Sequence, residues 1–187
     1  MIHPNDIARA KTSILNGGVI LCPTDTIWGL SADARDNRAL ARVFDIKNRP
    51  ENKSMIVLVS DETMLANYVN EIPKLAIDLL HKASRPTSII YPSGKNLAPL
   101  AIAANGSVAI RIVKEEFCNR LITELGFPII STSANLSGEA SAPKFEDVSA
   151  IIKDRVDYIV EYKQNDKNEA NASSIFSIKG DEIEQLR

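Results

Sequence analysis

Short apolar runs alternate along this chain with longer segments of mixed polarity. Apolar runs of this kind, bounded by proline, glycine or polar residues, are typical of buried β-strands. They predict strands in the segments VILCP (19–23), MIVLV (55–59), SIIYP (88–92), SVAIRIV (107–113), FPIIST (127–132), DYIVEY (157–162) and SSIFSI (173–178).

Between the strands, apolar residues recur at the three- and four-residue spacing of a helix face. Asn5 can cap a first helix, which the pair Gly17-Gly18 ends, and Asn37 opens a second helix. Pro73 fits the first turn of a third helix, and a fourth is expected over 115–125. The apolar positions on the first three helix faces are Ile7, Ile14 and Leu15, then Leu40, Val43 and Phe44, then Leu75, Leu79 and Leu80.

Strands that alternate with helices indicate an α/β fold with a largely buried sheet. The length of 187 residues, with 44% hydrophobic and 25% charged residues, fits one globular domain over residues 1–187. The segment KQNDKNEANA (163–172) is polar and without apolar rhythm, and we interpret it as a loop over the functional site.

The charge balance narrows the choice of partners. A net charge of −2 and a pI near 5.8 provide no general positive field for nucleic acid, so any phosphate site must be a local cluster of cations. Cys22 and Cys118 belong to no disulfide or metal motif, which suits a reducing compartment. The chain lacks a basic and apolar leader and any apolar run of about 20 residues, so we expect a cytoplasmic protein without membrane contact.

Familiar nucleotide-binding motifs are missing. Ser93-Gly94-Lys95 is similar to the end of a phosphate-binding P-loop, but Asn96 follows where Ser or Thr is required, and no GxGxxG occurs. His3 and His81 have no acidic or thiol neighbours at ligand spacing, which favours ordinary surface positions for both.

Two polar segments near the predicted strands in the first third of the chain are candidates for chemistry, because loops at strand ends gather ligands in α/β sheets. The segment PTDT (23–26) places three small polar residues after a strand, and a simple capped turn explains it about as well as a functional site does. Lys47, Arg49 and Lys53 form a local cation cluster. Capping of a helix C-terminus accounts for the first two residues but not for Lys53, which precedes a strand.

Two further candidates lie later in the chain. Arg111 interrupts an apolar strand, and burial of its charge requires an anion or a carboxylate, unless it faces solvent. The segment STSANLSG (131–138) concentrates hydroxyls, an amide and a glycine, which form a ready receptor for an anion or a ribose.

In this order, the four segments resemble the YrdC/TsaC family of L-threonylcarbamoyladenylate synthases. PTDTIWGL (23–30) is similar to the family's PT(D/E)TxYGL block, KNRP (47–50) with Lys53-Ser54 to KxRP…K, VAIR (108–111) to V(A/G)VR, and STSANLSG to the SAN-S-G signature. The resemblance runs from about residue 5 to the C-terminus and includes SSIF from Ser173. Trp28 replaces the usual Tyr, and Leu58 stands where many members have a His. The resemblance implies a single YrdC-like domain, with a twisted mixed β-sheet flanked by helices and a concave cationic cleft.

The resemblance also implies residue roles. Threonine would be bound by Thr26, Arg111, Ser131 and Ser173, with Arg111 pairing its carboxylate. ATP would be contacted by Arg49, Lys53, Ser107, Ser133, Asn135, Ser141 and Arg187, and the catalytic cations would be Lys47, Arg49 and Lys53.

The reaction that the resemblance implies condenses L-threonine, bicarbonate and ATP into threonylcarbamoyl-AMP and pyrophosphate. Transferase proteins would then pass the threonylcarbamoyl group to the adenosine beside a tRNA anticodon, and weak contact with tRNA is a further expectation. N-carboxythreonine is already a nucleophile, so alignment and cations suffice. Mg²⁺ is the expected cofactor, bound mainly through ATP phosphates, and no protein metal site is predicted.

Two other interpretations remain open at this point. One is an RNA-binding module of the same fold without synthase activity, against which the acidic pI and the lack of basic runs argue. The other is carbamoyl transfer for metal-cofactor maturation, but the larger proteins of that kind carry further regions that have no counterpart in this sequence.

Overall fold

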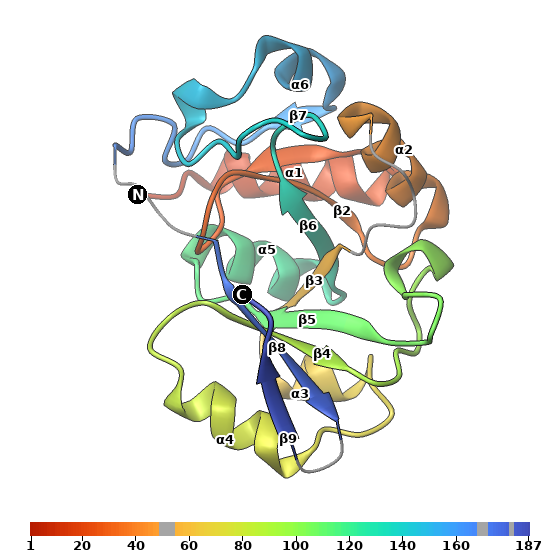
Figure 1. Cartoon of the computed structure of the whole chain (residues 1–187). Helices are drawn as coiled ribbons and strands as arrows, with labels where there is room; N and C mark the ends of the chain where they lie inside the picture. Colours follow the sequence, from red (N-terminus) through yellow and green to blue (C-terminus); the bar gives the residue numbers. More distant parts are fainter. Residues whose placement is uncertain (49–54, 168–171, 180–181) are drawn as a thin grey trace.

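The computed structural model describes residues 1–48, 55–167, 172–179 and 182–187. Within these ranges nine strands form one mixed sheet in the order β7-β1-β2-β6-β3-β5-β4-β8-β9 (Figure 1). The strands are β1 (Ile20–Cys22), β2 (Gly29–Asp33), β3 (Ile56–Val59), β4 (Thr87–Tyr91), β5 (Val108–Ile112), β6 (Ile129–Ser133), β7 (Tyr158–Ile159), β8 (Ser174–Lys179) and β9 (Glu182–Gln185). The helices are α1 (Pro4–Leu15), α2 (Asn37–Lys47), α3 (Glu62–Ala66), α4 (Lys74–Lys82), α5 (Glu116–Leu125) and α6 (Ala150–Arg155), with short 3₁₀ turns η1 (Pro99–Ala101) and η2 (Phe145–Asp147).

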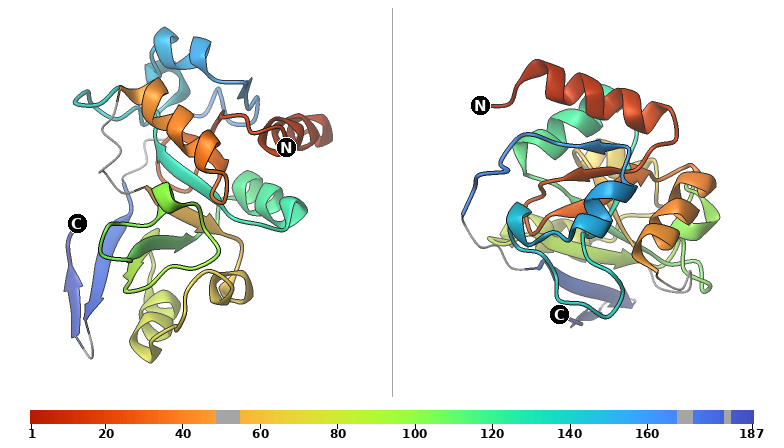
Figure 2. Two further views of the ribbon diagram at one scale, coloured as in Figure 1. Left: turned by 90° about the vertical axis from the view of Figure 1, so that its right-hand side faces the viewer. Right: turned by 90° about the horizontal axis from the view of Figure 1, so that it is seen from above.

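The hydrophobic core lies on both faces of the sheet, as alternation along a strand requires. Val57 and Val59 of β3 face one cluster of buried residues, while Leu58 between them faces the other. Helices α1 and α5 pack together over the Leu58 face, whereas α2 and η1 cover the opposite face (Figure 2). The sheet is therefore buried along its middle, and its functional groups must come from strand ends and loops. No helix in the described part of the chain has the length and apolar character needed to span a bilayer.

The predicted α/β fold is confirmed, with corrections at element ends. The first helix begins at Pro4 and not after Asn5, because His3 is the N-cap and its Nδ1 accepts from the backbone N–H of Asn5 at 3.3 Å. Leu15, expected on the buried face, is 58% exposed, since the helix ends there. Strand β2 was not predicted, because its sequence GLSAD lacks an apolar run. It is nevertheless buried between β1 and β6.

The two cysteines, far apart in sequence, meet in the core beside α5. Cys22 Sγ and Cys118 Sγ lie 4.0 Å apart, both thiols are free and fully buried, and Cys118 Sγ donates to Pro23 O at 3.1 Å. The contact with Cys22, together with burial, raises the pKa of Cys118 well above its ordinary value. Cys118 is therefore a protonated packing residue at neutral pH, which argues against thiolate chemistry here.

Glu115 caps the start of α5 from a buried position. Its Oε2 accepts from Cys118 N at 2.8 Å, and its Oε1 pairs with Lys163 Nζ at 3.2 Å. Burial raises the pKa of Glu115, although the bonds to Cys118 and Lys163 oppose this. A raised folded-state pKa means that the contribution of Glu115 to stability is largest below about pH 4 and is lost as the pH rises through the folded-state pKa.

We therefore expect Glu115→Gln, which keeps a side-chain acceptor for the cap, to become more favourable relative to wild type as the pH rises from 4 to 7. Thermal melts of both proteins at pH 4, 5.5 and 7 check this. A difference in Tm that stays constant across these values contradicts it.

Candidate functional site

The loop between β1 and β2 holds the first predicted motif in one fixed conformation. Thr24 Oγ1 donates to Ile27 O at 2.7 Å and accepts from Thr26 N at 3.1 Å. The Thr24 and Thr26 hydroxyls are 2.9 Å apart. Because the single hydroxyl proton of Thr24 is committed to Ile27, the Thr26 hydroxyl must be the donor of that pair. Thr26 thus turns lone pairs, and not its proton, toward any ligand.

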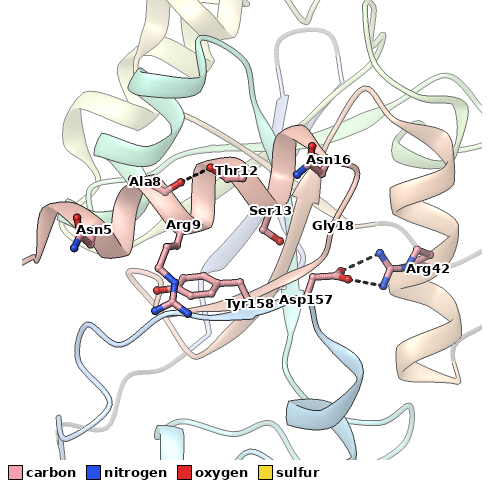
Figure 3. A pocket seen from close by; sticks show the side chains of 10 residues that line it. All are labelled: Asn5, Ala8, Arg9, Thr12, Ser13, Asn16, Gly18, Arg42, Asp157 and Tyr158. Carbon is pink, nitrogen blue, oxygen red and sulfur yellow. Dashed lines mark hydrogen bonds and ion pairs between the residues drawn. The ribbon is translucent and has the colours of Figure 1, made fainter.

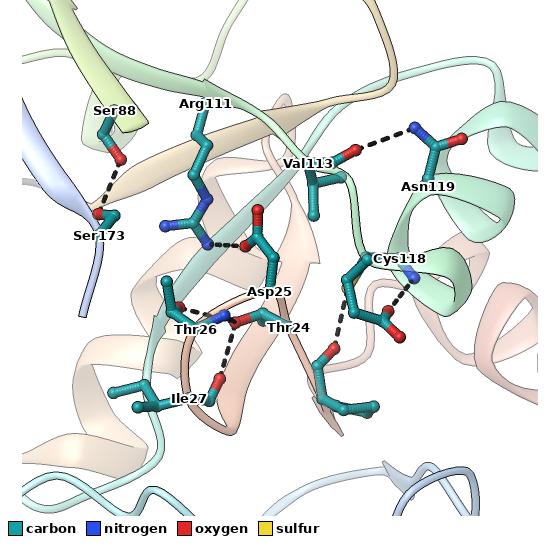
Figure 4. Close-up of polar contacts among 12 residues, drawn as sticks. Thr24, Asp25, Thr26, Ile27, Ser88, Arg111, Val113, Cys118, Asn119 and Ser173 are labelled. Carbon is teal, nitrogen blue, oxygen red and sulfur yellow. Dashed lines mark hydrogen bonds and ion pairs between the residues drawn. The ribbon is translucent and has the colours of Figure 1, made fainter. Parts of the chain in front are cut away.

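Arg111 lies in the site and is buried, which decides between the two interpretations of an arginine in an apolar strand. Its side chain is 3% exposed, and Nη2 lies 3.0 Å from Oδ1 of Asp25, whose side chain is 10% exposed. Figure 4 shows Asp25 on one side of the guanidinium and Thr26 and Ser173 toward the other. Burial lowers the pKa of Arg111, while the Asp25 carboxylate raises it, so the ion pair favours the charged form. The interpretation that Arg111 faces solvent is wrong.

The C-terminal hairpin supplies a second guanidinium. Leu186 N donates to Ile175 O at 2.8 Å, and this pairing places Arg187 beside the start of β8. Arg187 Nε and Nη2 donate to Ser173 O and Oγ at 2.9 and 3.2 Å. Ser173 Oγ is also 3.0 Å from Oγ of the fully buried Ser88. Ser173 is therefore held from both sides, by β4 and by the chain after β9.

These groups surround one cavity of about 250 Å³. Its volume is just below the ~300–1,000 Å³ of pockets for drug-sized ligands, and suits a small polar molecule. The cavity is lined by Thr24, Thr26, Ile27, Trp28, Gly29, Met55, Ile56, Arg111, Ser131, Thr132, Ser133, Ser141, Ala172, Ser173, Ile175 and Arg187. Segments widely separated in sequence thus present hydroxyls and two guanidiniums to the same space.

Gly29 leaves room for one of these hydroxyls. A Cβ at residue 29 would lie 2.7 Å from Ser131 Oγ and 3.3 Å from Thr132 O. The pairing of β2 with β6 sets this close approach, since Gly29 is opposite Ser133 and Ser31 is opposite Ser131.

We expect Gly29→Ala to displace the Ser131 hydroxyl and to lower stability by about 1–3 kcal/mol through overpacking. The double variant Gly29→Ala/Ser131→Ala removes the clashing oxygen, so it should recover most of the lost Tm. It should not recover ligand affinity. Thermal melts of the three variants check this, and no recovery in the double variant would contradict the proposed clash.

Lys47 and Asn135 form the inner frame of the STSANLSG loop. The buried Lys47 ammonium donates to Ser133 O and to Asn135 O, the latter at 2.5 Å. The Asn135 amide donates to Leu136 O at 3.0 Å and to Glu139 O at 2.8 Å. Both side chains therefore hold the loop in shape, and neither lines the cavity.

The structure brings together most of the predicted site residues that it describes. All four residues assigned to threonine line the cavity, as do Ser133, Ser141 and Arg187 from the ATP set; the four are Thr26, Arg111, Ser131 and Ser173. Ser107 does not line it, and its hydroxyl donates to Asn105 Oδ1 at 2.7 Å. Arg49 and Lys53 lie outside the described residues.

Sequence reasoning missed two residues that support the site from behind. Asp25 lies within the PTDT motif but was given no role of its own, and Ser88 was given no role in the site. The sequence offered one signal for each: a carboxylate in a polar turn between strands, and a hydroxyl at the start of an apolar strand, before Ile89. At the position where many relatives are expected to carry His, Leu58 is fully buried in the core and is not among the residues that line the cavity.

A larger hollow of about 730 Å³ lies between α1, β7 and α2 (Figure 3). Its charged groups are already paired. Arg42 contacts Asp157 at 2.9 Å, and Asp157 Oδ2 accepts from Val19 N at 2.7 Å. Arg9 pairs with Glu161 at 3.3 Å and stacks on the Tyr158 ring. We therefore place the chemistry in the smaller cavity, where donors and acceptors converge.

Comparison with known proteins identifies the family of this chain. The model of the Sua5/YciO/YrdC family, described as "Telomere recombination", matches residues 12–187. The chain belongs to this family. Members of the Sua5/YciO/YrdC family at 30% identity or more include a putative threonylcarbamoyl-AMP synthase of Methanocaldococcus jannaschii, with 32% identity over 95% of this chain and 82% of that protein. A threonylcarbamoyl-AMP synthase of Idiomarina loihiensis is 31% identical over 83% of this chain and 86% of its own length.

Solved structures of the Sua5/YciO/YrdC family share the fold. A variant of P. abyssi Sua5 superposes with a TM-score of 0.90 at 25% identity, over all of this chain and 57% of that one. P. abyssi Sua5 complexed with L-threonine gives 0.89 at 24% identity, over all of this chain and 55% of that one. E. coli YciO gives 0.82 at 20% identity, over 100% and 91% of the two chains. The mixed sheet with flanking helices is thus the family fold.

Proposed function

We propose that this protein is an L-threonylcarbamoyladenylate synthase, a nucleotidyltransferase that condenses L-threonine, bicarbonate and ATP and releases pyrophosphate. The observation that carries the proposal is the single cavity that unites Thr26, Arg111, Ser131 and Ser173 with Ser133, Ser141 and Arg187. The synthase names of relatives at 31–32% identity support it. The product would serve transferase proteins that modify the adenosine beside a tRNA anticodon.

The buried end of the cavity has the polarity that an amino acid requires. Arg111 keeps donors directed away from Asp25, and its planar guanidinium suits a carboxylate. Thr26 turns lone pairs to the cavity, because its proton is committed to Thr24, and lone pairs suit the N–H groups of the substrate amine. Ser173 and Ser131 add hydroxyls beside these two groups.

A second group of residues that line the cavity suits the phosphates of a nucleotide. Ser133, Ser141 and Arg187 provide hydroxyls and a guanidinium for phosphate oxygens. Lys47 would act by shaping the loop that carries Ser133, while Arg49 and Lys53 remain candidates for the triphosphate on sequence grounds.

The described residues contain no group of three or more His, Cys, Asp or Glu able to hold a metal ion. Mg²⁺ is therefore proposed to arrive with ATP, bound by phosphate oxygens and water, and to supply charge neutralisation for the leaving pyrophosphate. The chain's own contribution is to bind and to align.

The proposed reaction needs no nucleophilic side chain. The threonine amine and bicarbonate give the carbamate and water, and one carbamate oxygen then attacks the α-phosphorus of ATP. A new P–O bond forms as the bond to pyrophosphate breaks. Binding the carbamate in the cavity with the ATP phosphates beside it would make this step effectively intramolecular, and positioning of this kind can supply much of the rate acceleration.

The deciding experiment is pyrophosphate release from ATP and bicarbonate with Mg²⁺, measured with L-threonine, with L-serine and without an amino acid. Release that depends on threonine is expected. Release that is absent, or independent of threonine, in a folded sample contradicts the proposal. RNA binding that weakens steeply with salt, in a protein without this activity, would instead support the RNA-binding interpretation.

A further inference from the structure

The partner of Arg111 is a residue without an assigned role. Asp25 belongs to the β1–β2 loop and Arg111 to β5, and the sheet order places β6 and β3 between these elements. The ion pair therefore links the β1–β2 loop to a strand that is distant in the sheet. Asp25 is not among the residues that line this cavity, but it lines a separate hollow on the other side of the loop. Its carboxylate approaches the guanidinium from the side opposite Ser173 (Figure 4).

The ion pair with Asp25 does not satisfy every hydrogen-bond donor of the Arg111 guanidinium. Arg111 Nε is buried and has no hydrogen-bond partner among the described residues, and Asp25 Oδ1 is close to Nη2 without hydrogen-bond alignment. A buried guanidinium with an unmatched N–H is costly unless a ligand completes its bonds. Asp25 thus fixes the orientation of the Arg111 guanidinium but leaves part of its hydrogen-bonding capacity unsatisfied.

The two guanidiniums of the cavity differ in their charge balance. Arg111 is paired with the Asp25 carboxylate, whereas Arg187 donates to Ser173 O and Oγ and forms no ion pair within the described residues. The pair of Arg111 and Asp25 is therefore close to neutral, whereas Arg187, beside Ser173, keeps its positive charge. A zwitterion suits the first and a polyphosphate suits the second.

We propose that Asp25 is a positioning and specificity-determining residue, which orients Arg111 and neutralises it so that the inner end of the cavity takes a zwitterionic amino acid and rejects simple anions. This proposal rests on the proposed synthase function. It explains how one cavity sorts a small amino acid from the phosphates of ATP. Specificity here is a difference between two affinities, and Asp25 changes that difference.

The test compares L-threonine with (R)-3-hydroxybutyrate, which is threonine without its amino group. Trp28, the chain's one tryptophan, lines the cavity, so its fluorescence follows binding of either compound without turnover. In Asp25→Asn, an uncompensated Arg111 should weaken threonine binding and strengthen 3-hydroxybutyrate binding. We expect the dissociation constant of threonine, divided by that of 3-hydroxybutyrate, to increase by about tenfold or more.

Two further variants separate this role from a general structural one. Asp25→Glu keeps the charge but displaces the guanidinium, so threonine binding should weaken while the ratio stays within about threefold of wild type. Asp33→Asn is the matched control, because Asp33 pairs with Arg35 at 2.9 Å away from the cavity, and it should change neither affinity nor ratio.

The outcomes discriminate between the two proposals. An unchanged ratio in Asp25→Asn, or a ratio that shifts in Asp25→Glu as far as in Asp25→Asn, overturns the role of Asp25. If wild-type protein neither binds threonine nor releases pyrophosphate with it, the synthase proposal itself fails.

Discussion

Arg111→Ala is expected to lower kcat/KM for threonine by about 100-fold or more, while the affinity for ATP changes far less. The reason is the position of Arg111 at the inner end of the cavity, where its guanidinium faces the side of Thr26 and Ser173. Loss of this buried, charged hydrogen-bond donor removes the proposed contact with the threonine carboxylate. Pyrophosphate release at varied threonine and at varied ATP separates the two effects.

The same substitution should also reduce stability. Removal of the guanidinium leaves the Asp25 carboxylate, 10% exposed, without its counter-charge. Uncompensated buried charges of this kind cost about 3 kcal/mol, or about 10 °C in Tm for a domain of this size. Arg111→Lys keeps the charge without the planar guanidinium, so its stability should lie between that of wild type and that of Arg111→Ala. Arg120→Ala, which removes an exposed pair with Glu124 at 3.0 Å, is the control and should cost less than about 1 kcal/mol.

In the kinetic experiment, equal losses of kcat/KM for threonine and for ATP in Arg111→Ala would contradict the assigned division of the cavity.

Lys47→Met is the second substitution with a large expected effect. The variant keeps the apolar stem but leaves the carbonyl oxygens of Ser133 and Asn135 without their buried donor. Loss of such bonds costs about 2–3 kcal/mol, which corresponds to a decrease in Tm of about 5–10 °C. Because Ser133 lines the cavity, kcat/KM for ATP should also decrease by about tenfold or more.

The control for Lys47→Met is Lys11→Met. Lys11 Nζ also donates to a backbone carbonyl, Glu124 O at 2.7 Å, but at an exposed position. We expect its effect on stability to stay within about 0.5 kcal/mol. Thermal melts of both variants, with ATP kinetics, test the idea that Lys47 acts through the loop. A Lys47 variant that is fully stable but inactive would instead indicate direct catalysis by its ammonium.

The sequence was sufficient to predict the strands whose apolar runs are long enough to identify. It was also sufficient to state that a buried Arg111 needs an anion or a carboxylate. It could not identify Asp25 as that carboxylate, because the contact joins a loop after β1 to the distant strand β5 across two intervening strands. Pairings of this kind depend on sheet order, which local patterns do not encode.

Lys47 illustrates a different limit of prediction from the sequence. As a cation near a helix end it was interpreted as a capping or catalytic charge, yet its ammonium is buried against the loop of Ser133 and Asn135. Composition and spacing give the charge of a residue but not the direction of its side chain. The strand β2 was missed for a related reason: Gly29, Ser31 and Asp33 carry little strand propensity, and tertiary packing determines their conformation.

The cavity draws its walls from the loop after β1, from β5 and β6, and from the hairpin of β8 and β9. These elements come from both ends and the middle of the chain, so the binding site is complete only when the whole sheet has assembled. Long-range pairings of this kind form late and slowly during folding. Bound threonine should therefore slow hydrogen exchange of amides throughout the central sheet, and not only of those beside the ligand, because it stabilises the folded state as a unit.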